Sequence, residues 1–253
     1  MDILLEKKDR TALLTLDRPP LNVLNLPMLR ELQAALDLLS GDGAIDFLVI
    51  RGGGERAFSA GVDVQDHTRE KVPEMLEVVH GVIRSFLSLP QITIALVRGA
   101  CLGGGCELAS SCDFILASDD SFFATPEIHV GCYPPVALVR FTSQIGYHRA
   151  AEMILTGRRI SAQEAAGMGL INHAVPAVEL EQALETLLEE LNGKSRAVLR
   201  IALRGLRETS LRNFPAELKS SEDLYLRELL KTEDVEEGVR AFLEKRKPCW
   251  RHR

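Results

Sequence analysis

The chain lacks the features that define several classes of protein. None of its 253 residues belongs to a run approaching the roughly 18 uninterrupted apolar residues of a membrane span, and residues 1–8 contain no apolar signal core. The five cysteines are odd in number and have no C-x-x-C spacing, so neither a disulfide framework nor a zinc site is indicated. A net charge of -6 gives no general electrostatic reason to bind nucleic acid. We therefore expect a soluble cytoplasmic protein without a metal site.

The most informative stretch is a glycine triplet, Gly103 to Gly105, between an apolar run at 92–97 and a segment with helical character. It lacks the Lys-Ser/Thr of a phosphate-binding P-loop, and Leu108 stands where a dinucleotide fingerprint needs glycine. A tight turn that packs helix on strand is the plain alternative. Where strand passes into helix, however, unpaired N–H groups lie at the positive end of the helix dipole and can bind a polarised carbonyl oxygen. Glu107, about one turn into the helix, would lie beside that oxygen.

Two further segments, one before and one after the glycine-rich stretch, complete a pattern of three motifs. Ala57 to Asp63 reads A-F-S-A-G-V-D, Gly99 to Leu108 reads G-A-C-L-G-G-G-C-E-L, and Pro126 to Ile128 reads P-E-I. Together they resemble the crotonase, or enoyl-CoA hydratase/isomerase, superfamily, and the resemblance extends over nearly the whole chain. It implies an α/β fold, a right-handed ββα spiral core followed by a C-terminal helical region.

The resemblance also implies roles for individual residues. The backbone N–H groups of Val62 and Gly104 would form an oxyanion hole, and Glu107 and Glu127 would be the catalytic carboxylates. Substrate-binding residues implied in the same way are Ser59, Ala60, Val64, Leu102, Gly103, Tyr133, Pro134, Val136, Phe242 and Lys245. Phe242 and Lys245 are expected to reach a coenzyme A bound with a neighbouring subunit, because family members form trimers, often doubled to hexamers. Coenzyme A is then part of the substrate, an acyl-CoA thioester, and no separate cofactor is implied.

The hydrophobic pattern divides the chain into two parts. The periodicity predicts a C-terminal helical region over residues 195–253. The resemblance implies that residues 1–194 form the spiral core with the acyl-CoA site and that the C-terminal region mediates oligomerisation. Apolar residues at three- and four-residue steps predict a long helix over residues 73–89. Residues 113–117 and 121–124 are predicted to be strands of the same sheet.

One segment departs from the family pattern. Pro135, Ala137 and Leu138 stand where many hydratases have flexible glycines, which predicts a stiffer and more apolar wall beyond the acyl group. This variation is similar to that of the cyclohexa-1,5-diene-1-carbonyl-CoA hydratases, so a cyclic dienoyl thioester is a candidate substrate beside linear enoyl chains.

The expected reaction is addition of water to an α,β-unsaturated acyl-CoA thioester, or its removal. One alternative is double-bond isomerisation, which needs a single carboxylate as proton shuttle. A second alternative is a non-catalytic member of the fold that binds acyl-CoA or RNA; the carboxylate pair and the acidic charge balance argue against it. His67 and His80 flank the expected approach to the site, and each is either a substrate contact or a packing histidine.

Overall fold

The structure, a computed structural model of residues 1–253, contains two sheets. The larger has the order β1-β2-β3-β5-β7-β10, and its neighbouring strands are parallel except for β1 and β2. The smaller has the order β4-β6-β8-β9, in which only β8 and β9 are antiparallel. The strands are β1 (Ile3–Lys8), β2 (Thr11–Leu16), β3 (Phe47–Gly52), β4 (Ala57–Ser59), β5 (Ile92–Val97), β6 (Ala100–Leu102), β7 (Phe114–Ser118), β8 (Phe122–Ala124), β9 (Ile160–Ser161) and β10 (His173–Val175).

Helices cover both faces of the larger sheet. The α-helices are α1 (Leu26–Ser40), α2 (Val72–Ser88), α3 (Gly104–Ser110), α4 (Pro135–Ile145), α5 (Tyr147–Thr156), α6 (Ala162–Met168), α7 (Leu180–Asn192), α8 (Arg196–Ser210), α9 (Phe214–Arg227) and α10 (Glu233–Leu243). Four short 3-10 helices are η1 (Val64–Asp66), η2 (Pro126–Val130), η3 (Ala177–Glu179) and η4 (Leu229–Lys231). No helix is both long enough and apolar enough to cross a membrane.

The core repeats a strand-strand-helix unit. In each unit the first strand joins the larger sheet, the second joins the smaller sheet, and a helix follows: β3-β4-α2, then β5-β6-α3, then β7-β8 with η2 and α4. Successive units stack because β3, β5 and β7 are parallel neighbours, as are β4, β6 and β8. The result is the ββα spiral that the resemblance predicted.

The prediction that residues 113–117 and 121–124 share one sheet is wrong. β7 belongs to the larger sheet and β8 to the smaller one. A tight turn separates them: the Ser121 N–H donates to the Ser118 carbonyl at 2.9 Å, and the two serine hydroxyls are 2.7 Å apart. The chain therefore changes direction after β7 and enters the second sheet.

Helix α1 shows why the sequence forms a helix where it does. The Asn25 side chain accepts a hydrogen bond from the Met28 N–H at 3.0 Å and so caps the helix, and Pro27 lies in its first turn. Leu32, Leu36 and other apolar residues recur on one face and are fully buried. That face helps to fill the main hydrophobic core.

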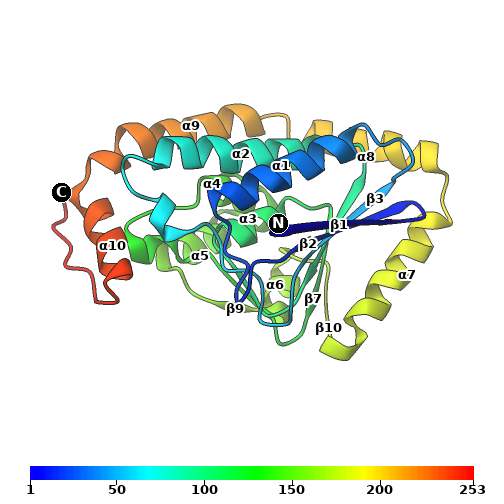
Figure 1. The fold of residues 1–253 in the computed structure, drawn as a ribbon, viewed down its shortest axis with the longest axis horizontal. Helices are drawn as coiled ribbons and strands as arrows, with labels where there is room; N and C mark the ends of the chain where they lie inside the picture. Colours follow the sequence, from blue (N-terminus) through cyan, green and yellow to red (C-terminus); the bar gives the residue numbers. More distant parts are fainter.

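The C-terminal helices pack around the rest of the chain. α8 lies with α7 on one face of the larger sheet, where Leu180, Leu184 and Leu203 join a smaller hydrophobic cluster. α9 contacts α4, and α10 contacts η1 and η2. In Figure 1, α1, α2 and α9 run side by side along the top of the molecule, and α10 lies at the end where the C-terminus is found. Helices after residue 195 thus reach the part of the core that carries the sequence motifs.

Candidate active site

The three motifs meet at one edge of the smaller sheet. β4, β6 and β8 are parallel neighbours, with Ser59 paired to Cys101 and Leu102 paired to Ala124. Their carboxyl ends therefore lie side by side, as the ends of parallel strands must. The segment after β4 contains Val62, the segment after β6 contains the glycine triplet, and the segment after β8 contains Glu127.

Glycine is required at two of these strand ends. Gly103 has φ 52° and ψ -128°, and a Cβ there would lie 2.6 Å from Glu127 Oε1. Gly61 has φ 92°, and a Cβ there would lie 2.8 Å from the Leu102 carbonyl oxygen. The absence of side chains at both positions lets the loop after β4 approach the start of α3, with the Glu127 carboxyl packed against Gly103.

Two backbone N–H groups are left without partners at this junction. The Leu24 N–H donates to the Gly61 carbonyl and the Asp63 N–H donates to the Leu24 carbonyl, whereas the Val62 N–H between them makes no hydrogen bond within the chain. Gly104 is the first residue of α3, and its N–H likewise makes none, as expected in the first turn of a helix. A Cβ at Gly104 would lie 3.4 Å from the Val62 nitrogen, so the two donors are close together.

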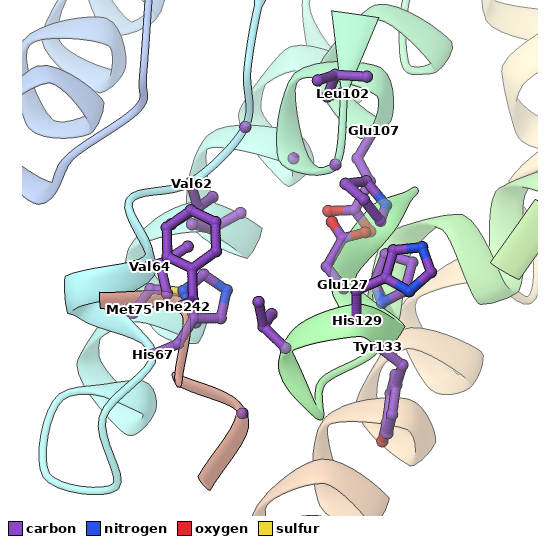
Figure 2. Close-up of a pocket in the computed structure, with 18 of the residues that line it drawn as sticks. Val62, Val64, His67, Met75, Leu102, Glu107, Glu127, His129, Tyr133 and Phe242 are labelled. Atoms are coloured by element: carbon purple, nitrogen blue, oxygen red, sulfur yellow. The ribbon is translucent and has the colours of Figure 1, made fainter. Parts of the chain in front are cut away.

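Glu107 and Glu127 face each other beside these donors. Figure 2 shows their carboxyl groups brought together from α3 and η2, across the cavity from Val62 and Phe242. Glu107 is 4% exposed, and its Oε1 accepts a hydrogen bond from the Ala137 N–H at 2.8 Å. Glu127 is partly exposed as a residue, but its Oε2 is buried and has no hydrogen-bond partner.

The surroundings affect the pKa values of these two carboxyl groups in different ways. Burial and the charge of Glu107 raise the pKa of Glu127 to about 8. Burial also raises the pKa of Glu107, but its hydrogen bond from Ala137 and the nearby His80 act in the opposite direction. Two carboxyl groups that face each other in a buried site do not readily ionise together. The hydrogen bond from Ala137 favours the ionised form of Glu107, whereas the buried Oε2 of Glu127 has no such partner.

These groups line a cavity of about 420 Å³. The lining includes Val62, Gly104, Glu107 and Glu127 together with seven of the predicted substrate-binding residues: Ala60, Val64, Leu102, Gly103, Tyr133, Pro134 and Phe242. The structure therefore brings most of the predicted site residues to one place. Pro135, from the segment that departs from the family pattern, belongs to the same wall and begins α4.

Three predicted residues lie outside the cavity lining. The Ser59 hydroxyl is fully buried, where it donates to the Asn22 carbonyl at 2.7 Å and accepts from the Gly61 N–H at 3.1 Å. It holds the loop after β4 in place. The Val136 side chain points into the hydrophobic core and is fully buried there. Lys245 is exposed just beyond the end of α10.

Phe242 lines the cavity of its own chain, and so do Arg246 and Pro248. The expectation from the resemblance placed Phe242 beside the coenzyme A of a neighbouring subunit. In the structure, α10 packs against η1 and η2 of the same chain, and this packing carries Phe242 to the cavity (Figure 2). Sequence comparison with a motif identifies such a residue but not the chain whose site it serves.

The sequence analysis left His67 and His80 open and did not identify Tyr225 as a site residue. All three are buried and line the cavity. His67 Nδ1 is 3.0 Å from the Asp63 carbonyl oxygen, and burial lowers the pKa of its ring. Tyr225 comes from α9, nearly one hundred residues after Glu127, and no local pattern in the sequence signals its position.

Comparison with known proteins identifies the family. The profile of the family described as "Enoyl-CoA hydratase/isomerase" matches residues 6–253. A Rhizobium meliloti protein named "Probable enoyl-CoA hydratase" is 36% identical, over 99% of this chain and 98% of its own. The "Cyclohexa-1,5-dienecarbonyl-CoA hydratase" of Thauera aromatica is 32% identical over 100% and 97%. The crystal structure of an enoyl-CoA hydratase from Mycobacterium avium subsp. paratuberculosis superposes with a TM-score of 0.89 at 26% identity, covering 99% of this chain and 98% of that one. This chain belongs to the enoyl-CoA hydratase/isomerase family and is an enzyme of its hydratase type.

Proposed function

We propose that this protein adds water to the double bond of an α,β-unsaturated acyl-CoA thioester, with Glu107 and Glu127 as base and acid. The observation that carries the proposal is the carboxyl pair: two facing glutamates beside two free N–H donors, with Glu107 hydrogen-bonded by Ala137 and Glu127 Oε2 without a partner. Coenzyme A is part of the substrate in this proposal, and neither a further cofactor nor a nucleic acid takes part.

The Val62 and Gly104 N–H groups would bind the thioester oxygen. When water attacks the far carbon of the conjugated double bond, negative charge develops on that oxygen, and donors aimed at it stabilise the enolate. Each such donor contributes roughly 3 kcal/mol to lowering the barrier. Both donors make no other hydrogen bond within the chain, so nothing competes with the substrate for them.

Each glutamate then carries out one of the two proton transfers. Ionised Glu107 takes a proton from the attacking water, whose oxygen forms a bond to the β carbon. Protonated Glu127 gives its proton to the α carbon as the enolate collapses. The pair begins and ends with one proton, and moving that proton from Glu107 back to Glu127 restores the starting state.

The test is hydration of crotonyl-CoA by two separate variants, Glu107→Gln and Glu127→Gln. Each should lower kcat by about 10²-fold or more, the usual contribution of a positioned acid or base. Glu77→Gln, an exposed glutamate on α2, is the matched control and should keep full activity. Full activity of either site variant would remove that residue from the mechanism. A product with a shifted double bond and no oxygen from ¹⁸O-labelled water would indicate isomerisation instead.

A cyclic dienoyl thioester is a second candidate substrate. Pro134 and Pro135 form part of the cavity wall, where they restrict the backbone. The 32% identical relative from Thauera aromatica supports this candidate. Comparing kcat/KM for crotonyl-CoA and cyclohexa-1,5-diene-1-carbonyl-CoA distinguishes the two, and a higher value for the linear thioester would reject the cyclic one as the preferred substrate.

Assembly into a trimer or hexamer stays a prediction. Three apolar side chains of α8, Val198, Ile201 and Leu206, are 63%, 63% and 69% exposed, which supports a contact between chains.

A further inference from the structure

His80 is a buried histidine that connects helix α9 to the cavity. It is 1% exposed and lines the cavity from α2, and its Nδ1 lies 2.7 Å from Glu222 Oε1 on α9. Glu222 does not line the cavity. A separation of 2.7 Å is typical of a hydrogen bond between a charged nitrogen and a carboxylate, since neutral N–H···O pairs are usually about 2.9–3.0 Å apart. The contact therefore fits an ion pair between an imidazolium and an ionised carboxyl group.

Glu222 has the properties of such an ionised group. Its hydrogen bond with His80 lowers its pKa; burial acts against this, and the charges of His80, Arg84 and Lys219 lower the pKa further. Arg84 Nη1 lies 3.4 Å from Oε1, and Lys219 Nζ lies 3.7 Å from Oε2. Both of these side chains are exposed, so water screens their charges, whereas His80 is buried. His80 is therefore the main partner of Glu222.

On the cavity side, the charge of His80 acts on Glu107. Burial raises the pKa of Glu107, whereas the hydrogen bond from Ala137 and the positive charge of His80 lower it. Glu107 and His80 line the same cavity and are both buried, so a charge on one is screened from the other less than at the protein surface. A positively charged His80 thus favours the ionised form of Glu107, which is the form that can accept a proton from water.

The other basic residues of the cavity lining are less suited to this role. Burial lowers the pKa of His67, which favours its neutral form. Arg246 is paired with Glu237 and Glu244, and His129 is exposed to solvent. The remaining ionisable groups of the lining supply no positive charge; besides Glu107, they are Glu127, Tyr133 and Tyr225.

We propose that His80 is a positioning residue that carries a positive charge, held by Glu222, and so keeps Glu107 ionised. This inference rests on the function proposed above, because it concerns the state in which Glu107 acts as the base. Charge then alternates along the three residues, from negative Glu222 on α9 to positive His80 on α2 and negative Glu107 on α3. Without the imidazolium, Glu107 would take up a proton at higher pH and would stop acting as a base there.

The first experiment measures the acidic limb of the kcat/KM profile for crotonyl-CoA, where Glu107 takes up its proton. His80→Gln keeps a hydrogen-bond donor for Glu222 but has no charge, so it should move this limb to higher pH by about one unit. The pH-independent kcat/KM should stay near the wild-type value, whereas a merely structural role of His80 would lower it. Glu222→Gln should move the limb in the same direction. In the double variant the second exchange should add nothing, because Glu222 acts through His80.

Arg84→Gln is the matched control. Arg84 is the other α2 residue that contacts Glu222, but it is exposed and does not line the cavity. Its replacement removes a positive charge from the same helix and should leave the acidic limb in place. If His80→Gln does not fold, Glu222→Gln alone still tests the proposal. An acidic limb that stays at its wild-type position in a folded His80→Gln or Glu222→Gln variant would overturn the inference.

Nuclear magnetic resonance tests the same charges without catalysis. In protein labelled with ¹⁵N-histidine, both ring nitrogens of His80 should carry hydrogen at about pH 7. The signal is assigned by its absence from His80→Gln, and in Glu222→Gln it should change to that of a neutral ring. In protein labelled with ¹³C at the glutamate carboxyl groups, the Glu107 signal should titrate at higher pH in His80→Gln than in the wild type.

A neutral His80 ring in the wild-type protein, or a Glu107 titration that does not move in His80→Gln, would contradict the proposal. The two resonance measurements need no substrate. A charged His80 that shifts the Glu107 titration, in a protein that hydrates no enoyl-CoA, would refute the proposed reaction and leave this inference standing.

Discussion

The cavity has two walls that arise in different ways. The first, called here the reaction wall, comprises Val62, Gly103, Gly104, Glu107 and Glu127, all within a few residues of the ends of β4, β6 and β8. The second, called here the acyl wall, comprises Met75, His80, Tyr133, Tyr225 and Phe242, which come from α2, the segment before α4, α9 and α10. Strand pairing positions the reaction wall, whereas helix packing positions the acyl wall.

Because of this difference, we expect the two walls to respond differently to amino-acid substitutions. Paired strand ends hold the reaction wall in a fixed geometry, so even a small displacement there should lower kcat strongly. We expect that side chains presented by packed helices can be exchanged with smaller loss of activity, and that such exchanges mainly affect which acyl group binds. We therefore expect reaction-wall variants to lose kcat and acyl-wall variants to change KM or substrate preference.

The largest expected effect is that of Gly103→Ala. A methyl group there would lie 2.6 Å from Glu127 Oε1, and φ is 52°, where alanine is strained. Glu127 must move, and kcat for crotonyl-CoA should fall by about 10²-fold or more. Gly81→Ala is the control, since a Cβ there meets nothing within 4 Å and the exchange favours helix α2. A Gly103→Ala variant with wild-type kcat would show that the reaction wall is less tightly constrained than strand register implies.

The next effect is on the pH dependence of the reaction. Glu127 must hold a proton to act as the acid, and burial with the charge of Glu107 raises its pKa to about 8. kcat/KM should therefore decrease above about pH 8, approaching tenfold per pH unit. The rate profile of Glu127→Gln should lack this alkaline limb, whereas that of the surface variant Glu77→Gln should keep it. An alkaline limb of unchanged position in Glu127→Gln would assign the titration to another group.

The same group links stability to pH. The pKa of Glu127 is about 8 in the folded protein against 4.5 for a free glutamate, so the folded state binds the proton more tightly. The stabilisation that this proton provides is complete below about pH 4.5 and is lost as the pH rises through about 8. Relative to Glu127→Gln, the wild-type free energy of unfolding should therefore be lower at pH 9 than at pH 5. Urea titrations of both proteins at the two pH values measure this difference.

The reaction wall could be predicted from the sequence because its determinants are local. A strand followed by glycines and a helix indicates free N–H groups, and Glu107 lies one turn into that helix. Pro126 marks the start of the third segment, after the strand predicted at residues 121–124. The order and spacing of the three motifs then place each of them at the end of a strand. The family resemblance then assigns roles that the residues alone leave open.

The acyl wall could not be predicted in the same way. The periodicity of α2 indicates a buried face, but it does not show that His80 borders a cavity rather than the core. Val136 is the converse case: it follows the cavity residues Pro134 and Pro135 in the sequence, but its side chain is buried in the hydrophobic core. Tyr225 depends on how α9 packs, and this packing involves contacts between residues more than eighty positions apart, such as Tyr133 with Ser221. Only tertiary structure contains that information.

The smallest effect concerns Phe242, which lines the cavity of its own chain and whose contact with a coenzyme A bound with a neighbouring subunit stays a prediction. Phe242→Ala removes a half-exposed aromatic side chain from the acyl wall, so KM should rise by roughly tenfold or less with little change in kcat. Mixing this variant with inactive Glu107→Gln chains, after dissociation and reassembly, tests which chain Phe242 serves. If it lines the cavity of its own chain, every active site in the mixture lacks Phe242 and KM stays raised. If it serves a neighbour, some active sites regain the aromatic ring from a Glu107→Gln chain, and KM returns toward the wild-type value.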